Sequence, residues 1–94
     1  MAGCMPSFVE FEWDENKRVA NAEKHGIDFA DAVQVFEDPR QVTFRAAHHG
    51  EERFLSIGAI RGHIATVVFT LRGEKIRIIS VRSARKSERA HYER

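Results

Sequence analysis

The hydrophobic period of the sequence changes at Asp38-Pro39, and this change constrains the fold more than any other feature. Before it, residues 29–36 place apolar side chains at positions i, i+3, i+4 and i+7, which is the spacing of a helix with one buried face. After it, apolar and polar side chains of residues 42–82 mostly alternate, with the two-residue period of strands. Pro39 separates the two regions because proline disfavours a helical conformation in the preceding residue. The chain is therefore expected to combine helices with a sheet.

The same two periods predict the elements before Pro39. Apolar and acidic side chains alternate over residues 9–13, which predicts a strand. Residues 14–25 predict a helix that Asp14 caps at its start and Gly26 ends. Asp28 is expected to cap the second helix.

Four consecutive strands and a final helix are expected after Pro39. The strands are predicted at residues 42–46, 53–60, 64–71 and 75–82, with a loop at residues 47–52. Ser83 is expected to cap a C-terminal helix that reaches about Tyr92. The predicted order is β-α-α-β-β-β-β-α. This order predicts an α+β domain in which two N-terminal helices and a C-terminal helix pack on an antiparallel sheet.

The length of 94 residues predicts one domain, at residues 8–94, after a flexible segment at residues 1–7. No apolar stretch approaches the roughly 20 residues that span a bilayer, and residues 1–7 lack the features of a secretory signal. A cytoplasmic protein without membrane contact is therefore expected. Cys4 is the single cysteine, so an internal disulfide is excluded. His48-His49 is weak evidence for a metal site, and neither a metal nor a cofactor is expected.

Charge is distributed unevenly along the chain. Residues 1–52 contain eleven Asp or Glu and five Lys or Arg, a net charge of −6, whereas residues 53–94 contain ten Lys or Arg and three Asp or Glu, a net charge of +7. Seven of these ten cations lie between Arg72 and Arg89, around an apolar run that predicts a strand. The cations are therefore expected on a folded surface that binds an anion. Because guanidinium groups pair with phosphate oxygens, RNA or DNA is the expected anion.

The arginines near strand ends are the first candidates for phosphate binding, namely Arg53, Arg72 and Arg82. Strict alternation would place Arg77 and Arg82 on opposite faces of the sheet unless a bulge intervenes. On the last predicted helix, Arg85 and Arg89 share a face. They either hold phosphates or belong to a solvated helix with surface pairs such as Arg85–Glu88.

His25 and Tyr92 each allow two interpretations. His25 either favours the negative end of a helix dipole or transfers a proton beside a phosphate. Tyr92 either contacts RNA through its ring or hydroxyl, or anchors a helix that has little else to bury. Trp13, Phe29 and Phe36 are expected in the core.

Several short motifs together resemble the BrnT family of toxins. They include Phe11-Glu12-Trp13-Asp14, Lys24-His25-Gly26-Ile27, Asp38-Pro39, Gly50-Glu51-Glu52-Arg53, Phe69-Thr70-Leu71-Arg72 and Arg77-Ile78-Ile79-Ser80-Val81-Arg82. The resemblance covers nearly all of the chain after residue 7. It implies a RelE-like fold and a metal-independent ribonuclease that halts translation. It also implies a BrnA-like antitoxin that neutralises the toxin and represses the shared operon, so that operator DNA is contacted only through the complex.

The leading hypothesis is therefore RNA cleavage by attack of a ribose 2′-hydroxyl on the adjacent phosphorus. The residues expected to carry the chemistry are His25, Arg53, Arg77, Arg82 and Tyr92, with His91 as a further proton-transfer candidate. The residues expected to bind RNA are Lys24, Arg72, Lys75, Arg85 and Arg89. One alternative is a nucleic-acid-binding or regulatory module that does not cleave. Another is an interaction domain whose basic surface docks an acidic protein.

Overall fold

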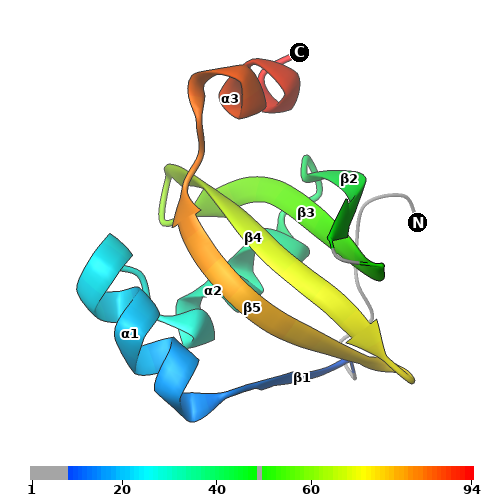
Figure 1. The fold of residues 1–94 in the computed structure, drawn as a ribbon. Coiled ribbons are helices and arrows are strands. Elements are labelled where there is room, and N and C mark those ends of the chain that lie inside the picture. Colours follow the sequence, from blue (N-terminus) through cyan, green and yellow to red (C-terminus); the bar gives the residue numbers. More distant parts are fainter. Residues whose placement is uncertain (1–8, 49) are drawn as a thin grey trace.

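A computed structural model describes residues 9–48 and 50–94 of the chain (Figure 1). The elements are β1 (Glu10–Trp13), α1 (Glu15–His25), α2 (Phe29–Glu37), β2 (Val42–His48), β3 (Glu51–Ile60), β4 (His63–Arg72), β5 (Lys75–Ser83) and α3 (Lys86–Tyr92). Their order confirms the predicted order and the α+β class. The expected flexible segment at residues 1–7, with Cys4, lies outside the described residues, as does His49.

The five strands form one sheet in the order β1-β5-β4-β3-β2, so β4 lies at its centre. Strands β2 to β5 are antiparallel neighbours, but β1 pairs with β5 in parallel. The prediction of an antiparallel sheet is therefore wrong, because the sheet is mixed. Two helices, rather than a hairpin, connect β1 to the other strands, so no tight turn dictates its direction.

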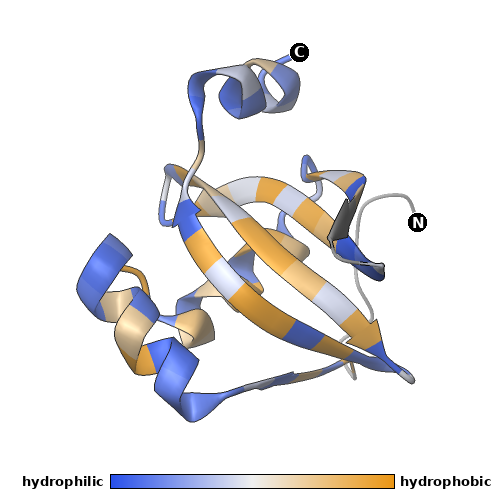
Figure 2. Cartoon of the chain, in the orientation of Figure 1, coloured by the Kyte–Doolittle hydropathy of each residue, from blue (hydrophilic) through white to orange (hydrophobic). Residues whose placement is uncertain are grey.

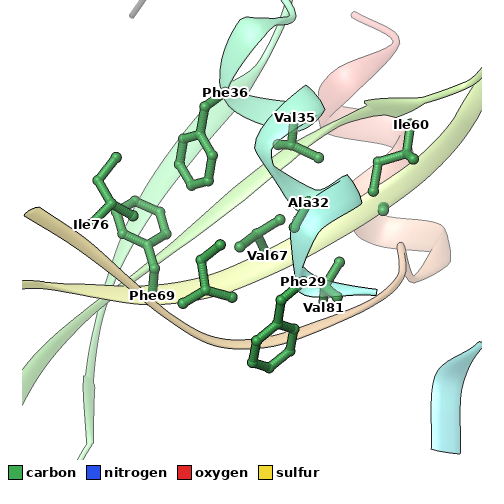
Figure 3. Close-up of a cluster of buried hydrophobic side chains, with 11 residues drawn as sticks. Phe29, Ala32, Val35, Phe36, Ile60, Val67, Phe69, Ile76 and Val81 are labelled. Atoms are coloured by element: carbon green, nitrogen blue, oxygen red, sulfur yellow. The ribbon is translucent and has the colours of Figure 1, made fainter. Parts of the chain in front are cut away.

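The hydrophobic core lies between the sheet and α2 (Figure 3). Phe29, Ala32, Val35 and Phe36 of α2 are buried, which confirms the predicted apolar face of this helix. The Phe36 ring lies 5.0 Å from the ring of Phe69 on β4. Trp13 is partly buried against the same cluster, as expected of a core residue.

The predicted caps of the first two helices are confirmed. The Asp14 carboxylate accepts a hydrogen bond from the backbone N–H of Asn16 at 2.8 Å, and the Asp28 carboxylate accepts one from Ala30 at 2.9 Å. Gly26 ends α1 with φ of 73°, a left-handed conformation in which glycine meets no steric penalty.

Two predicted boundaries are wrong. The expected loop at residues 47–52 is a hairpin, because the ladder between β2 and β3 continues to the pair His48–Glu51. Ser83 does not cap α3. It ends β5, and its hydroxyl shares a hydrogen bond of 2.8 Å with Nε2 of His63 on β4. Helix α3 starts later, at Lys86, where the Glu88 carboxylate accepts the backbone N–H of Arg85.

Asn21 on α1 completes the edge of β5 beyond the end of β1. Strand β1 pairs only with residues 75–78 of β5. Further along, the Asn21 amide donates to the carbonyl oxygen of Val81 at 2.9 Å, and its Oδ1 accepts the Val81 N–H at 3.2 Å. It also donates to the carbonyl of Ile27. A side-chain amide thus takes the place of a neighbouring strand and fixes α1 along this edge.

Figure 2 shows hydrophilic and hydrophobic segments alternating along β5, as expected of a strand with one face against a core. Within the described part of the chain, none of the helices is long and apolar enough to cross a membrane.

Candidate functional site

A bulge in β5 brings Arg77 and Arg82 to the same face of the sheet. The register between β4 and β5 shifts by one residue at Ile79. Arg82 pairs with Thr66, and Arg77 pairs with Thr70. These threonines lie four residues apart in β4 and so point to the same side, which places both arginines together. The alternation of residue types alone could not show that β5 contains this bulge, or where the bulge lies.

We call this side of the sheet, opposite α2, the open face. Cross-strand partners share a face, so the register assigns the other side chains to it. Its principal members are Glu12, Phe44, Arg53, Leu55, Thr66, Val68, Thr70, Arg77 and Arg82. The open face therefore gathers the three arginines that the sequence analysis proposed for catalysis.

Arg77 and Arg82 are each paired with a carboxylate. Arg77 contacts Glu12 of β1 at 2.9 Å. Arg82 makes two parallel hydrogen bonds to Glu88 of α3, at 2.8 and 2.9 Å, and its side chain is only 16% exposed. Glu12 therefore holds the Arg77 guanidinium by one contact, whereas Glu88 holds the Arg82 guanidinium by two hydrogen bonds. Arg82 has fewer donors left for an anion.

Arg53 differs because one donor of its guanidinium is buried without a partner among the described residues. Its nearest carboxylate is that of Glu51, at 3.4 Å, and this contact is with one terminal nitrogen. Its Nε is buried and has no hydrogen-bond partner among the described residues. A buried N–H without a partner is costly. The side chain is 25% exposed, so the terminal nitrogens of the guanidinium are the donors that an anion on this face would reach.

Tyr92 fastens α3 to the loop after α2. Its hydroxyl donates to Oδ2 of Asp38 at 2.6 Å, and only 7% of the residue is exposed. The hydrogen bond to Asp38, together with burial, raises the pKa of Tyr92. The Arg40 guanidinium lies over the Tyr92 ring, 5.0 Å from its centre. The structure therefore gives Tyr92 an anchoring contact, the second of the two interpretations.

Glu88 forms the other attachment of α3. Besides Arg82, its carboxylate accepts the hydroxyl of Thr66 at 2.9 Å. The hydrogen bonds from Arg82 have the largest effect on the pKa of Glu88. They lower it to about 2, although burial acts to raise it. The expected surface pair between Arg85 and Glu88 is replaced by the pair with Arg82, because Glu88 faces the sheet.

Acid is expected to weaken the attachment of α3 through Glu88. Because the folded-state pKa is lowered from 4.5 to about 2, the stabilisation is complete above about pH 4.5 and is lost as the pH falls toward 2. Glu88→Gln should lower the free energy of unfolding at pH 6 by roughly 1–3 kcal/mol, since Arg82 loses a charged partner. Urea denaturation at pH 6 and pH 3 measures both proteins. The difference between them should shrink at pH 3, and an equal difference at the two pH values would contradict this role.

The other cations predicted near β5 lie at the two ends of the open face and do not form one cluster. Arg72 and Lys75 flank the β4–β5 turn, and Lys75 contacts Glu10 at 3.6 Å. Arg85 and Arg89 are exposed at the other end, before and on α3. Lys75 and Arg82 are seven residues apart, about 20 Å along a strand. These cations therefore bracket the face along the length of β5.

Lys24 and His25 are not on the open face. They end α1, which lies along the β5 edge through the contacts of Asn21 with Val81. Among the described residues, the His25 ring has no hydrogen-bonding partner, and the side chain is half-buried. The structure thus separates His25 from the three arginines by the edge of the sheet.

Sequence reasoning assigned no role in the site to Asn21, Asp38 or Phe44, and it gave Glu88 only a surface pair with Arg85. One signal was available for Glu88, which is the single carboxylate between Arg82 and Arg89 in a run of cations. The partners of Asn21 and Asp38 lie 60 and 54 residues away, respectively, so no local pattern marks them.

The apolar cavity of the protein lies away from these residues. It measures about 440 Å³, and its walls include Phe36, Phe54, Phe69 and Ile76 from the core side of the sheet. None of the predicted site residues lines it. In the described part of the chain, no three His, Cys, Asp or Glu side chains gather where they could hold a metal ion.

A comparison with protein families finds a matching model. It is described as a ribonuclease toxin, BrnT, of a type II toxin–antitoxin system, and it matches residues 13–88. The matched region runs from the end of β1 to Glu88 on α3, and so includes every arginine of the open face. No curated protein matches the chain at a significant level.

Proposed function

The chain belongs to the BrnT family of ribonuclease toxins of type II toxin–antitoxin systems, and from this premise we propose that it cleaves RNA on the open face. The observation that carries the proposal is the Arg53 guanidinium, which shares a face with Arg77 and whose carboxylate contact, to Glu51, is as long as 3.4 Å. A phosphate would supply its terminal nitrogens with closer acceptors than Glu51, and the side chain is 25% exposed, so these nitrogens are within its reach. Guanidinium groups fixed in position are suited to the extra negative charge of the reacting phosphate.

The proposed reaction is attack of a ribose 2′-oxygen on the adjacent phosphorus. A bond forms from the 2′-oxygen to phosphorus, and the bond from phosphorus to the 5′-oxygen breaks. The 2′-hydroxyl proton passes to a base, and the departing 5′-oxygen takes up a proton. The products are a 2′,3′-cyclic phosphate and a free 5′-hydroxyl. In this scheme the charge of the pentavalent state is met by Arg53 and Arg77, so no metal ion is required.

Two imidazoles flank the open face as candidates for proton transfer. His91 is exposed on α3, where its ring lies 5.1 Å from that of Phe44. His25 lies at the β5 edge. Tyr92 is a weaker candidate base, because donation to Asp38 and the raised pKa keep its hydroxyl protonated. We assign Arg82 to positioning, because Glu88 occupies its guanidinium.

Family membership implies an antitoxin partner, and we propose a BrnA-like protein that covers the open face or displaces α3. The two attachments of α3 support this, because Glu88 and Tyr92 hold it largely through polar contacts. Cutting messenger RNA would halt translation. Contact with operator DNA is proposed only for the complex with the antitoxin.

The test incubates the purified chain with single-stranded RNA in the presence of a chelator. Cleavage that leaves cyclic phosphate ends is the expected result. Tight binding without cleavage would instead favour a nucleic-acid-binding module. If the correctly folded protein neither binds nor cleaves the RNA, the proposal that RNA is its substrate is wrong.

A further inference from the structure

An apolar strip crosses the open face between Arg53 and Arg77 on one side and Arg82 with α3 on the other. Phe44 on β2 pairs with Leu55 on β3, which pairs with Val68 on β4. Cross-strand partners share a face, so the three side chains form one row. Leu55 and Val68 are partly exposed, and Phe44 is 37% exposed. The sheet thus presents apolar surface on the side where its arginines gather.

Phe44 is the aromatic end of this strip, with Arg53 on one side of it and His91 on the other. Arg53 pairs with Ala46, two residues along β2 from Phe44. Arg53 is therefore a diagonal neighbour of Phe44, with about 7–8 Å between their Cα atoms. On the other side, His91 of α3 meets the Phe44 ring edge-to-face, with an angle of 68° between the rings.

We propose that Phe44 stacks against an unpaired base of the RNA while Arg53 holds the neighbouring phosphate. This inference rests on the proposed function and adds a substrate class to it. An exposed aromatic ring beside fixed cations matches the two parts of a nucleotide, a flat base and a charged phosphate. Bases within a duplex are stacked on each other and cannot lie on a protein ring. The substrate is therefore RNA that is single-stranded at the cut, and Phe44 selects for it.

The experiment measures binding of a short RNA that cannot be cleaved because the reactive 2′-hydroxyls are replaced by 2′-methoxy groups. Phe44→Leu keeps an apolar side chain but removes the ring, and it is expected to weaken binding by about 5- to 100-fold. Phe44→Tyr retains a ring and should bind within about threefold of the unchanged protein. The same sequence as a closed duplex should bind more weakly than the single strand.

A second measurement separates the loss of base stacking in Phe44→Leu from an indirect loss of RNA binding through the docking of α3. The unchanged protein is tested against a set of RNAs that each lack one base but keep every phosphate. One of these abasic RNAs should lose affinity to a similar degree, and Phe44→Leu should be insensitive to that loss. Equal affinity of Phe44→Leu and the unchanged protein, while Arg53→Ala loses binding, would overturn the role of Phe44 and leave the proposed function standing. If the unchanged protein binds no RNA and an antitoxin alone buries Phe44, the proposed function fails as well.

Discussion

Replacing Arg53 by alanine is expected to lower the rate of RNA cleavage by about 10²–10³-fold, the usual effect of removing one donor that stabilises the charge of a transition state. Arg53 is the open-face arginine with the weakest carboxylate contact, 3.4 Å to Glu51, and its Nε lacks a partner among the described residues. Arg53→Lys keeps the charge but loses the two-pronged geometry, so it should recover only part of the rate. Gel-resolved cleavage of labelled RNA under single-turnover conditions measures these rates.

Two control variants test whether the loss of cleavage rate is specific to the open face. Arg61→Ala removes an arginine at the β3–β4 turn that is 73% exposed and contacts Asp31, and its cleavage rate should equal that of the unchanged protein. Tyr92→Phe should stay within a few-fold when equal amounts of folded protein are compared, because the hydroxyl binds Asp38. If Arg53→Ala cleaves as fast as Arg61→Ala, Arg53 takes no part in the reaction.

Asn21→Ala is expected to lower the free energy of unfolding by roughly 2–4 kcal/mol, although Asn21 is not part of the open face. The change leaves the N–H and the C=O of Val81 without partners at a buried position, and each such group costs about 1–3 kcal/mol. It also releases the contact that holds α1 along the edge of β5. Urea denaturation followed by circular dichroism measures the difference.

The matched control is Asn16→Ala, on the same helix. Asn16 is exposed, so this change should alter the free energy of unfolding by no more than about 0.5 kcal/mol. Asn21→Asp keeps an oxygen for the Val81 N–H but sets a carboxylate against the Val81 carbonyl, and it should destabilise at least as much as alanine. Unfolding of Asn21→Ala at the same urea concentration as Asn16→Ala would show that Asn21 does not hold the strand edge.

Local patterns predicted most of the fold. The apolar spacing and Asp28 cap of α2 depend on residues within one or two turns, and the hairpins depend on adjacent strands. The direction of β1 could not be predicted in this way, because each residue of β1 pairs with a residue 65 positions later. The hairpin of β2 and β3 was predicted too short, since its polar ends continue the ladder without adding apolar residues.

The candidate site was predictable as a set of cations but not as an arrangement. Clustering of arginine in the second half pointed to the right strands. It could not show that Glu88 occupies Arg82, or that Asp38 binds Tyr92, because both acids reach their partners only after α3 has folded back. Nor could the clustering distinguish Arg53 from the other arginines, because Arg53 differs in having a buried Nε without a partner among the described residues. Such differences depend on tertiary contacts, which residue types and spacing do not encode.

The bulge at Ile79 makes the open face depend on the length of β5 as well as on its composition. Every substitution at Ile79 keeps four residues between Arg77 and Arg82, that is, five steps along the strand, and only the bulge makes this odd number of steps compatible with one face. Loss of one codon at this point would remove the extra residue and leave four steps, so strict alternation would by itself keep both guanidinium groups on the open face. In a gene of this kind, a three-nucleotide deletion at Ile79 that preserves the reading frame would therefore leave the two arginines on one face and remove only the bulge.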